Sequence, residues 1–106
     1  MSKYDPDNQQ QEGIITEIEE EVTEPPMYKV LLHNDDFTTK EFVVNILVAV
    51  FNKSLDAAAR LMWSVHKTGV GVCGVYPYEI AETKINIVTA YARENGFPLK
   101  TTMEPE

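Results

Sequence analysis

A double proline, Pro25-Pro26, divides this 106-residue chain into two segments of very different composition. Residues 1–26 hold eight acidic residues, one basic residue and few apolar groups, so burial cannot offset the entropy that they would lose on ordering. Residues 27–106 hold nine acidic and eight basic residues. Because proline breaks a helix begun upstream and holds the chain extended, we expect a flexible, disordered acidic extension over 1–26 and one small folded domain over 27–106.

This distribution of charge excludes several classes of function. The formal net charge is −8, and nearly all of it lies in the extension, so the domain lacks the surplus of Lys and Arg that nucleic-acid binding requires. The sequence contains no apolar run with the length of a signal-peptide core or of a membrane span. Cys73 is the only cysteine, so an intrachain disulfide is impossible. We therefore expect a cytoplasmic protein that binds neither nucleic acid nor membrane. We also expect a monomer.

The first half of the domain predicts a strand followed by two helices. Residues 27–33 are rich in β-forming side chains and predict the strand. Thr38 and Glu41 have the spacing of a capping box at the start of the first helix. Ser54 is expected to cap the second helix, and Gly69 suits the position just after its end. Three- and four-residue spacing predicts that the buried faces consist of Val43, Ile46, Leu47 and Val50, and of Ala58, Leu61, Met62 and Val65.

The second half predicts a strand, a helix and a last strand. Residues 70–76 contain two glycines, which indicate a bulged strand or a close backbone approach. Pro77 suits the first turn of a third helix, Asn95-Gly96 ends it, and residues 98–103 can form a short strand. The apolar period of this helix predicts a face made of Ile80, Lys84, Ile87, Val88 and Tyr91. The order βααβαβ predicts an α+β domain with three helices packed on one face of a three-stranded antiparallel sheet.

Asn34, Asp35 and Asp36 follow the first strand directly and are the first candidates for a functional site. Side chains of this type form turns by bonding their own backbone, and that is one interpretation. One acidic residue would suffice for a turn, however, and adjacent carboxylates repel each other unless a cation is close. Two acids and an amide therefore also suit a metal ion or an ammonium group.

His66 is the second candidate, at the edge of the apolar face of the second helix, where a structural histidine is also common. Together with His33, Asp35 and Asp36 it could complete a metal site by tertiary contact, although the spacing matches no local metal motif. The sequence shows no nucleophile with a base and no glycine-rich phosphate loop. We therefore expect no enzyme activity, no bound metal and no cofactor.

Four sequence blocks between Pro25 and Met103 together resemble one known family. The blocks are PPMYKVLLHNDDFTTKEFVV, LMWSVHKTGVGVCGV, EIAETK and YARENGFPL. They resemble the ClpS family, the adaptor of the bacterial Clp ATP-dependent protease, whose fold is a βααβαβ domain. The resemblance implies an N-end rule adaptor, which captures proteins that begin with Leu, Phe, Tyr or Trp. It delivers them to the N-terminal domain of the AAA+ unfoldase ClpA, or a relative, which feeds the ClpP peptidase.

The resemblance also implies roles for particular residues of this chain. The family's amine-binding residues correspond to Asn34, Asp35, Asp36 and His66. Its hydrophobic pocket for the first side chain corresponds to Leu32, Thr38, Val43, Met62, Val65 and Leu99. Contacts with the unfoldase correspond to Glu79 and Lys84, and the extension used in substrate hand-over corresponds to residues 1–26.

Lys40 departs from the family pattern. Many members have the sequence TPM after the acidic pair, and the Met gates the pocket and excludes β-branched side chains. Here the stretch is Thr38-Thr39-Lys40. A lysine stem can cover an apolar pocket while its ammonium reaches water, so we expect Lys40 to line the pocket and to leave a looser gate toward Ile and Val.

Two other functions remain open on the sequence alone. The same fold serves a ribosomal stalk protein, so a ribosome-associated or other protein-binding module is one alternative. A metal-dependent enzyme built on the two histidines and two acids is the other.

Overall fold

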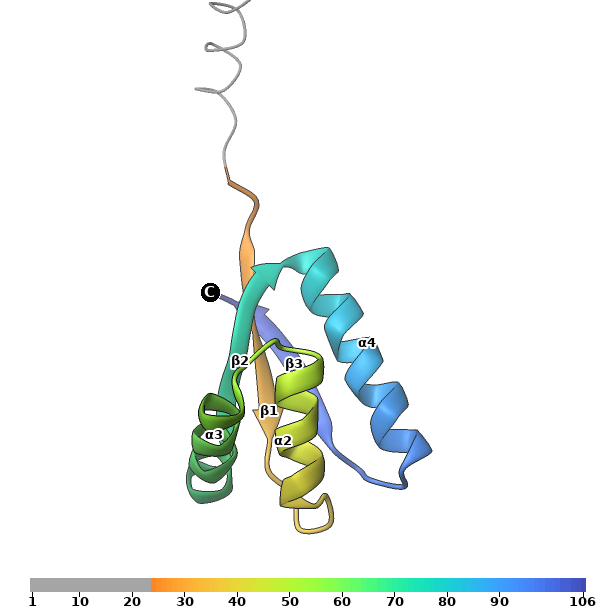
Figure 1. The fold of residues 1–106 in the computed structure, drawn as a ribbon. Coiled ribbons are helices and arrows are strands. Elements are labelled where there is room, and N and C mark those ends of the chain that lie inside the picture. Colours follow the sequence, from red (N-terminus) through yellow and green to blue (C-terminus); the bar gives the residue numbers. More distant parts are fainter. Residues whose placement is uncertain (1–23) are drawn as a thin grey trace, which may run out of the picture.

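The computed structural model describes residues 24–106 (Figure 1), so the predicted extension, 1–26, lies outside the described residues except for 24–26. The elements are β1 (Met27–His33), α2 (Lys40–Ala49), α3 (Leu55–Thr68), β2 (Val70–Pro77), α4 (Tyr78–Glu94) and β3 (Lys100–Pro105). The predicted order βααβαβ is confirmed. The last strand begins two residues later than expected, because residues 97–99 first cross from α4 to the sheet. No helix within 24–106 has the length and apolar character needed to cross a membrane.

The sheet is antiparallel, with β1 in the centre and the strand order β2-β1-β3. Figure 1 shows α2, α3 and α4 gathered on the same side of this sheet, as predicted. Val30 and Leu32 of β1 are fully buried, whereas Leu31 between them and His33 after them are only partly covered. Alternate side chains of a strand point to opposite faces, so the core lies between the helices and one face of the sheet.

A β-bulge interrupts the pairing of β1 with β2. Val30 pairs with Gly74 and Leu31 pairs with Val72, which leaves Cys73 as the extra residue. The glycine-containing strand therefore bulges, as its sequence predicts. Burial raises the pKa of the Cys73 thiol to about 12, so this side chain stays protonated and packs as a small apolar group.

The start of α2 differs by one residue from the prediction. Thr39 caps the helix, and its hydroxyl oxygen accepts a hydrogen bond from the backbone N–H of Phe42 at 3.1 Å. Thr38 belongs to the preceding turn, where its hydroxyl donates to Asp35 at 2.8 Å. Glu41 consequently lies one position too early to complete a capping box.

Helix α3 begins and ends where its sequence predicts. Ser54 accepts a hydrogen bond from Ala57 N at 3.1 Å, and Gly69 has a φ of 95°, in the left-handed region that glycine favours. The predicted core residues of α2 are all buried, and those of α3 are buried except for Leu61, which is half-buried and packs against the core.

The predicted core face of α4 is wrong. The buried residues of this helix are Ala81, Val88 and Ala92, and of these only Val88 belongs to the predicted set. Ile80, Ile87 and Tyr91 are 48%, 41% and 48% exposed, and Lys84 is half-buried. The buried face of α4 therefore contains two small alanines, and Ile85 packs partly against the core beside them, whereas Ile80, Ile87 and Tyr91 lie on the exposed side.

Candidate functional site

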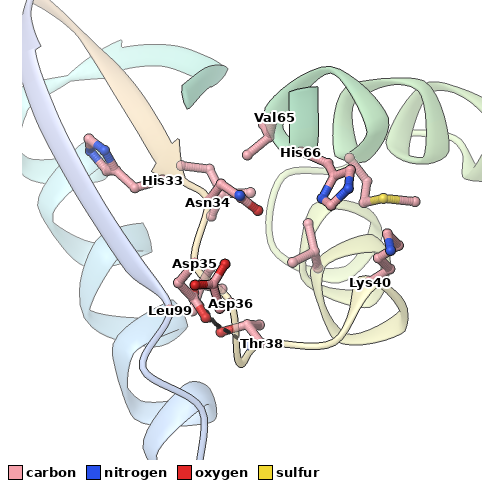
Figure 2. Close-up of a pocket in the computed structure, with 12 residues that line it drawn as sticks. His33, Asn34, Asp35, Asp36, Thr38, Lys40, Val65, His66 and Leu99 are labelled. Atoms are coloured by element: carbon pink, nitrogen blue, oxygen red, sulfur yellow. Dashed lines mark hydrogen bonds between the residues drawn. The ribbon is translucent and has the colours of Figure 1, made fainter. Parts of the chain in front are cut away.

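A cavity of about 170 Å³ opens between the end of β1, the loop that follows it, and helices α2 and α3 (Figure 2). All residues predicted for the amine site and for the hydrophobic pocket line this cavity, and His33 joins them. The lining consists of Leu32, His33, Asn34, Asp35, Asp36, Thr38, Lys40, Val43, Met62, Val65, His66 and Leu99. Residues from distant parts of the sequence therefore meet at one place, with polar groups and apolar groups both present.

The inner wall of the cavity belongs to the hydrophobic core. Its apolar lining residues are all buried: Leu32, Val43, Met62, Val65 and Leu99. An apolar cavity of ~150 Å³ in another protein accommodates benzene. A cavity of about 170 Å³ can thus accept one aromatic or branched aliphatic side chain without disturbing the fold.

Backbone contacts at the end of α3 bring His66 close to Asn34. The backbone N–H of Asn34 donates to the carbonyl of Gly69 at 2.9 Å, which joins the end of β1 to the residue that ends α3. At Gly71 the strand β2 passes so close to α3 that a Cβ would lie 2.7 Å from Val65 Cγ2. These two contacts fix the last turn of α3, and with it His66, beside the loop that carries the acidic residues.

Asp35 holds that loop in its shape. Its Oδ1 accepts hydrogen bonds from the backbone N–H groups of Phe37 at 2.8 Å and Thr38 at 2.7 Å, and its Oδ2 accepts from the Thr38 hydroxyl at 2.8 Å. Partial burial raises the pKa of Asp35, but the hydrogen bonds from Thr38 and Phe37 together lower it by more. The pKa of Asp35 therefore lies below its ordinary value of 3.8. Asp35 is therefore an ionised carboxylate with three of its roughly four acceptor positions occupied.

Three other polar side chains at the mouth are free to accept a ligand. Asn34, Asp36 and His66 are exposed, and their side chains form no hydrogen bond with any group in residues 24–106. Figure 2 shows the side chains of Asn34 and His66 pointing toward one another across the mouth, with Asp36 on the same side as Asn34. An amide oxygen, a carboxylate and an imidazole nitrogen thus surround a space suited to a cation with several donors.

The four-residue metal site considered above lacks geometric support. His33 Nε2 lies 2.8 Å from the hydroxyl of Thr102, and its ring points away from the cavity in Figure 2. Within residues 24–106 no three His, Cys, Asp or Glu side chains are grouped so that they could hold a metal ion. Asp35, Asp36 and His66 therefore do not form a three-ligand group for a metal ion.

Lys40 lies at the rim, and it contacts a residue that the sequence reasoning missed. Its Nζ is 5.2 Å from the ring centroid of Trp63, and that ring meets the His66 ring edge-on at 5.8 Å and 82°. Trp63 is the only tryptophan and is 48% exposed. The sequence signal for this contact is a single tryptophan on the polar side of α3, three residues before His66.

The two residues predicted to contact the unfoldase, Glu79 and Lys84, lie on α4, outside this cavity. Glu79 is exposed. Lys84 is occupied within the fold: its Nζ donates to the carbonyl of Val50 at 2.7 Å and lies 5.8 Å and 5.2 Å from the ring centroids of Phe51 and Tyr76. Lys84 therefore ties α4 to the end of α2.

Comparison with known proteins relates this domain to one family. Residues 23–102 match the family of the ATP-dependent Clp protease adaptor protein ClpS. The ATP-dependent Clp protease adapter protein ClpS of Desulforapulum autotrophicum is 57% identical over 91 residues, covering 86% of this chain and 88% of that relative. The protein of the same description from Nitratidesulfovibrio vulgaris is 59% identical over 87 residues, covering 82% of this chain and 87% of that relative.

A solved structure agrees with this relationship. The structure of Agrobacterium tumefaciens ClpS2 bound to L-phenylalaninamide has a TM-score of 0.75 and 47% sequence identity, and covers 78% of this chain and 100% of its own. The family match extends over most of the chain, and the fold is the same. This chain therefore belongs to the ClpS family of ATP-dependent Clp protease adaptor proteins.

Proposed function

We propose that this adaptor binds the free α-amino group and the bulky apolar first side chain of N-degron proteins. It would deliver those that begin with Leu, Phe, Tyr or Trp to the Clp unfoldase. The observation that carries the proposal is the position of three unpaired polar side chains at the mouth of an apolar cavity. The ligand of the Agrobacterium relative, L-phenylalaninamide, combines the same two chemical features, an α-amine and a benzyl group.

The polar groups suit an α-ammonium, which has one positive charge and three N–H donors. Asn34 supplies an amide oxygen, Asp36 a free carboxylate, and the His66 imidazole a ring nitrogen that can accept. Asp35 contributes its negative charge and at most one remaining acceptor position, because its other positions hold the loop. Charge-assisted hydrogen bonds contribute on the order of 1.5–3 kcal/mol each, so acetylation of the amine should remove most of the affinity.

The apolar cavity supplies the second requirement. Burial of a Leu or Phe side chain contributes roughly 1.5–3 kcal/mol. Combined with the amine contacts this fits a dissociation constant on the order of micromolar, which permits both capture and release. An internal Leu has no free amine and an N-terminal Gly has no side chain to bury, so only the combination distinguishes an N-degron.

Delivery would use the outer surface of α4. Glu79 is exposed there, next to Ile80, and Ile87 and Tyr91 continue the surface along the helix. We propose that Glu79 contacts the N-terminal domain of ClpA or a relative, and that Lys84 keeps this surface in place. The extension, 1–26, would take part in hand-over.

Fluorescence anisotropy with three peptides tests the proposal. One begins with Phe, the second is its N-acetylated twin, and the third begins with Ile. We expect the Phe-first peptide to bind and the acetylated peptide to lose most of that affinity. The Ile-first peptide reports how far Lys40 relaxes the gate. Equal binding of the free and acetylated Phe peptides, or no binding of either, would contradict the proposal.

A further inference from the structure

The two sides of the pocket mouth carry opposite charges. Asp35 and Asp36 lie on the side of the loop after β1, whereas Lys40 lies on the side of α2 (Figure 2). His66 of α3 faces the space between them. When a ligand's α-ammonium occupies the site, it neutralises charge on the acidic side. One negative charge then remains on the loop side, where the Asp35 carboxylate is held by Phe37 and Thr38, and Lys40 supplies the positive charge on the α2 side.

Helix stability does not explain a lysine at this position. Lys40 is the first residue of α2, where the N–H groups of the first turn favour a negative charge and disfavour a cation. Glu41, the next residue, has the sign that the helix favours. The chain thus accepts a locally unfavourable charge at a place where its side chain lines the pocket.

Trp63 fixes where that charge lies. The ammonium of Lys40 is 5.2 Å from the centroid of the indole ring, a distance at which the ring attracts a cation. The indole ring in turn packs edge-on against His66. The hydroxyl of Thr39 caps the helix start, so the backbone that carries Lys40 is fixed as well. The exposed Lys40 side chain therefore has its ammonium at the rim, over the Trp63 ring, in a contact that is weak at an exposed site.

We propose that Lys40 and Trp63 form a subsite for the second residue of the bound N-degron and that this subsite selects an acidic side chain. The inference rests on the proposed function. Successive Cα atoms are ~3.8 Å apart, so a peptide whose first residue fills the cavity places its second residue at the rim. A Glu or Asp carboxylate there can pair with the Lys40 ammonium, and its methylene groups can lie against the exposed indole of Trp63. A Lys or Arg at the same position meets a like charge.

Binding of three Phe-first peptides that differ only in the second residue, Glu, Gln or Lys, tests the subsite by anisotropy at low salt. Exposed ion pairs are weak, so we expect about a three- to tenfold preference for Glu over Lys, with Gln between them. The preference should shrink as ionic strength rises, because salt screens exposed charges.

Variants locate the source of the preference. Lys40→Gln should bring the Glu-to-Lys ratio close to one, and Trp63→Leu should reduce it because the ammonium is no longer held in place. Lys29→Gln removes the same charge from β1, where Lys29 pairs with Val75 and Glu104 and does not line the pocket, so it should leave the ratio unchanged.

The outcomes separate this inference from the proposed function. A wild-type ratio near one, or a ratio that survives Lys40→Gln, overturns the subsite while amine-dependent binding of the Gln peptide upholds the pocket. If the Gln peptide does not bind, or binds equally when acetylated, both proposals fail.

Discussion

The pocket mouth and the inner edge of α4 hold their charged and polar groups in opposite ways. At the mouth, the side chains of Asn34, Asp36 and His66 have no hydrogen-bond partner among the described residues, although each could accept one. On α4, the ammonium of Lys84 already donates to Val50 and lies over two aromatic rings. Family resemblance assigns an interface role to both regions. The structure distinguishes groups available to a ligand from a group that holds the fold together.

The same difference separates two neighbouring acidic residues. Asp35 accepts three hydrogen bonds and shapes the loop, whereas Asp36 accepts none within residues 24–106. Asp35 therefore forms the simple turn that the sequence allows. The carboxylate of Asp36 remains available to a cation.

Alanine substitution of each acid gives the largest expected effect. Asp36→Ala should weaken binding of a Phe-first peptide roughly 10- to 100-fold, since a hydrogen bond to a charged group contributes on the order of 1.5–3 kcal/mol. Its free energy of unfolding should change by less than about 0.5 kcal/mol. Asp35→Ala should lower the free energy of unfolding by about 1–2 kcal/mol and weaken binding as a consequence. Anisotropy and urea unfolding measure the two quantities.

The comparison fails if the two variants behave alike. Equal losses of stability would mean that Asp36 also supports the loop. A stable Asp36→Ala protein with unchanged affinity would mean that the amine is held by Asn34 and His66 without it.

The Lys84 contact gives the next largest effect. Lys84→Met keeps most of the stem but leaves the Val50 carbonyl without its charged donor and removes the cation from the rings of Phe51 and Tyr76. We expect the free energy of unfolding in urea to fall by about 1–2 kcal/mol, with little change in peptide affinity.

Glu79→Gln is the matched control on the same helix, because Glu79 is exposed. Its stability should stay within about 0.5 kcal/mol of the parent protein. Suppose that Lys84→Met unfolds at the same urea concentration as the parent yet loses binding to the unfoldase. Lys84 would then contact the unfoldase directly, and its hydrogen bond to Val50 would contribute little to stability.

The fold was predictable where apolar spacing and local caps agree. Strand β1 has the predicted bounds, and Ser54 and Gly69 delimit α3 as expected. The face of α4 was not predictable from the size of its apolar residues. Its buried residues are Ala81, Val88 and Ala92, and spacing alone does not reveal that a face with two alanines is the buried one.

The pocket was predictable as a set of residues, but the state of each side chain was not. The family resemblance assigns the same role to Asp35 and Asp36. Only the structure shows that the Asp35 carboxylate already accepts hydrogen bonds from Thr38. The contacts Lys84 with Val50 and Lys40 with Trp63 join residues 34 and 23 positions apart. Such contacts follow from tertiary packing, which no local pattern encodes.

Acid titration of stability gives the smallest effect and tests the loop directly. The pKa of Asp35 lies below its ordinary value in the folded protein, so the unfolded chain binds the proton first as pH falls. The contribution of this carboxylate to stability is thus fully present above about pH 5 and is lost as pH falls through the folded value.

Asp35→Asn keeps an acceptor oxygen but cannot titrate. The difference in unfolding free energy between the parent and Asp35→Asn should therefore shrink as pH falls below about 5, because the other carboxylates contribute equally to both proteins. Asp36→Asn controls for the loss of one loop charge. A difference that stays constant or grows on acidification would show that Asp35 does not hold the loop as an ion.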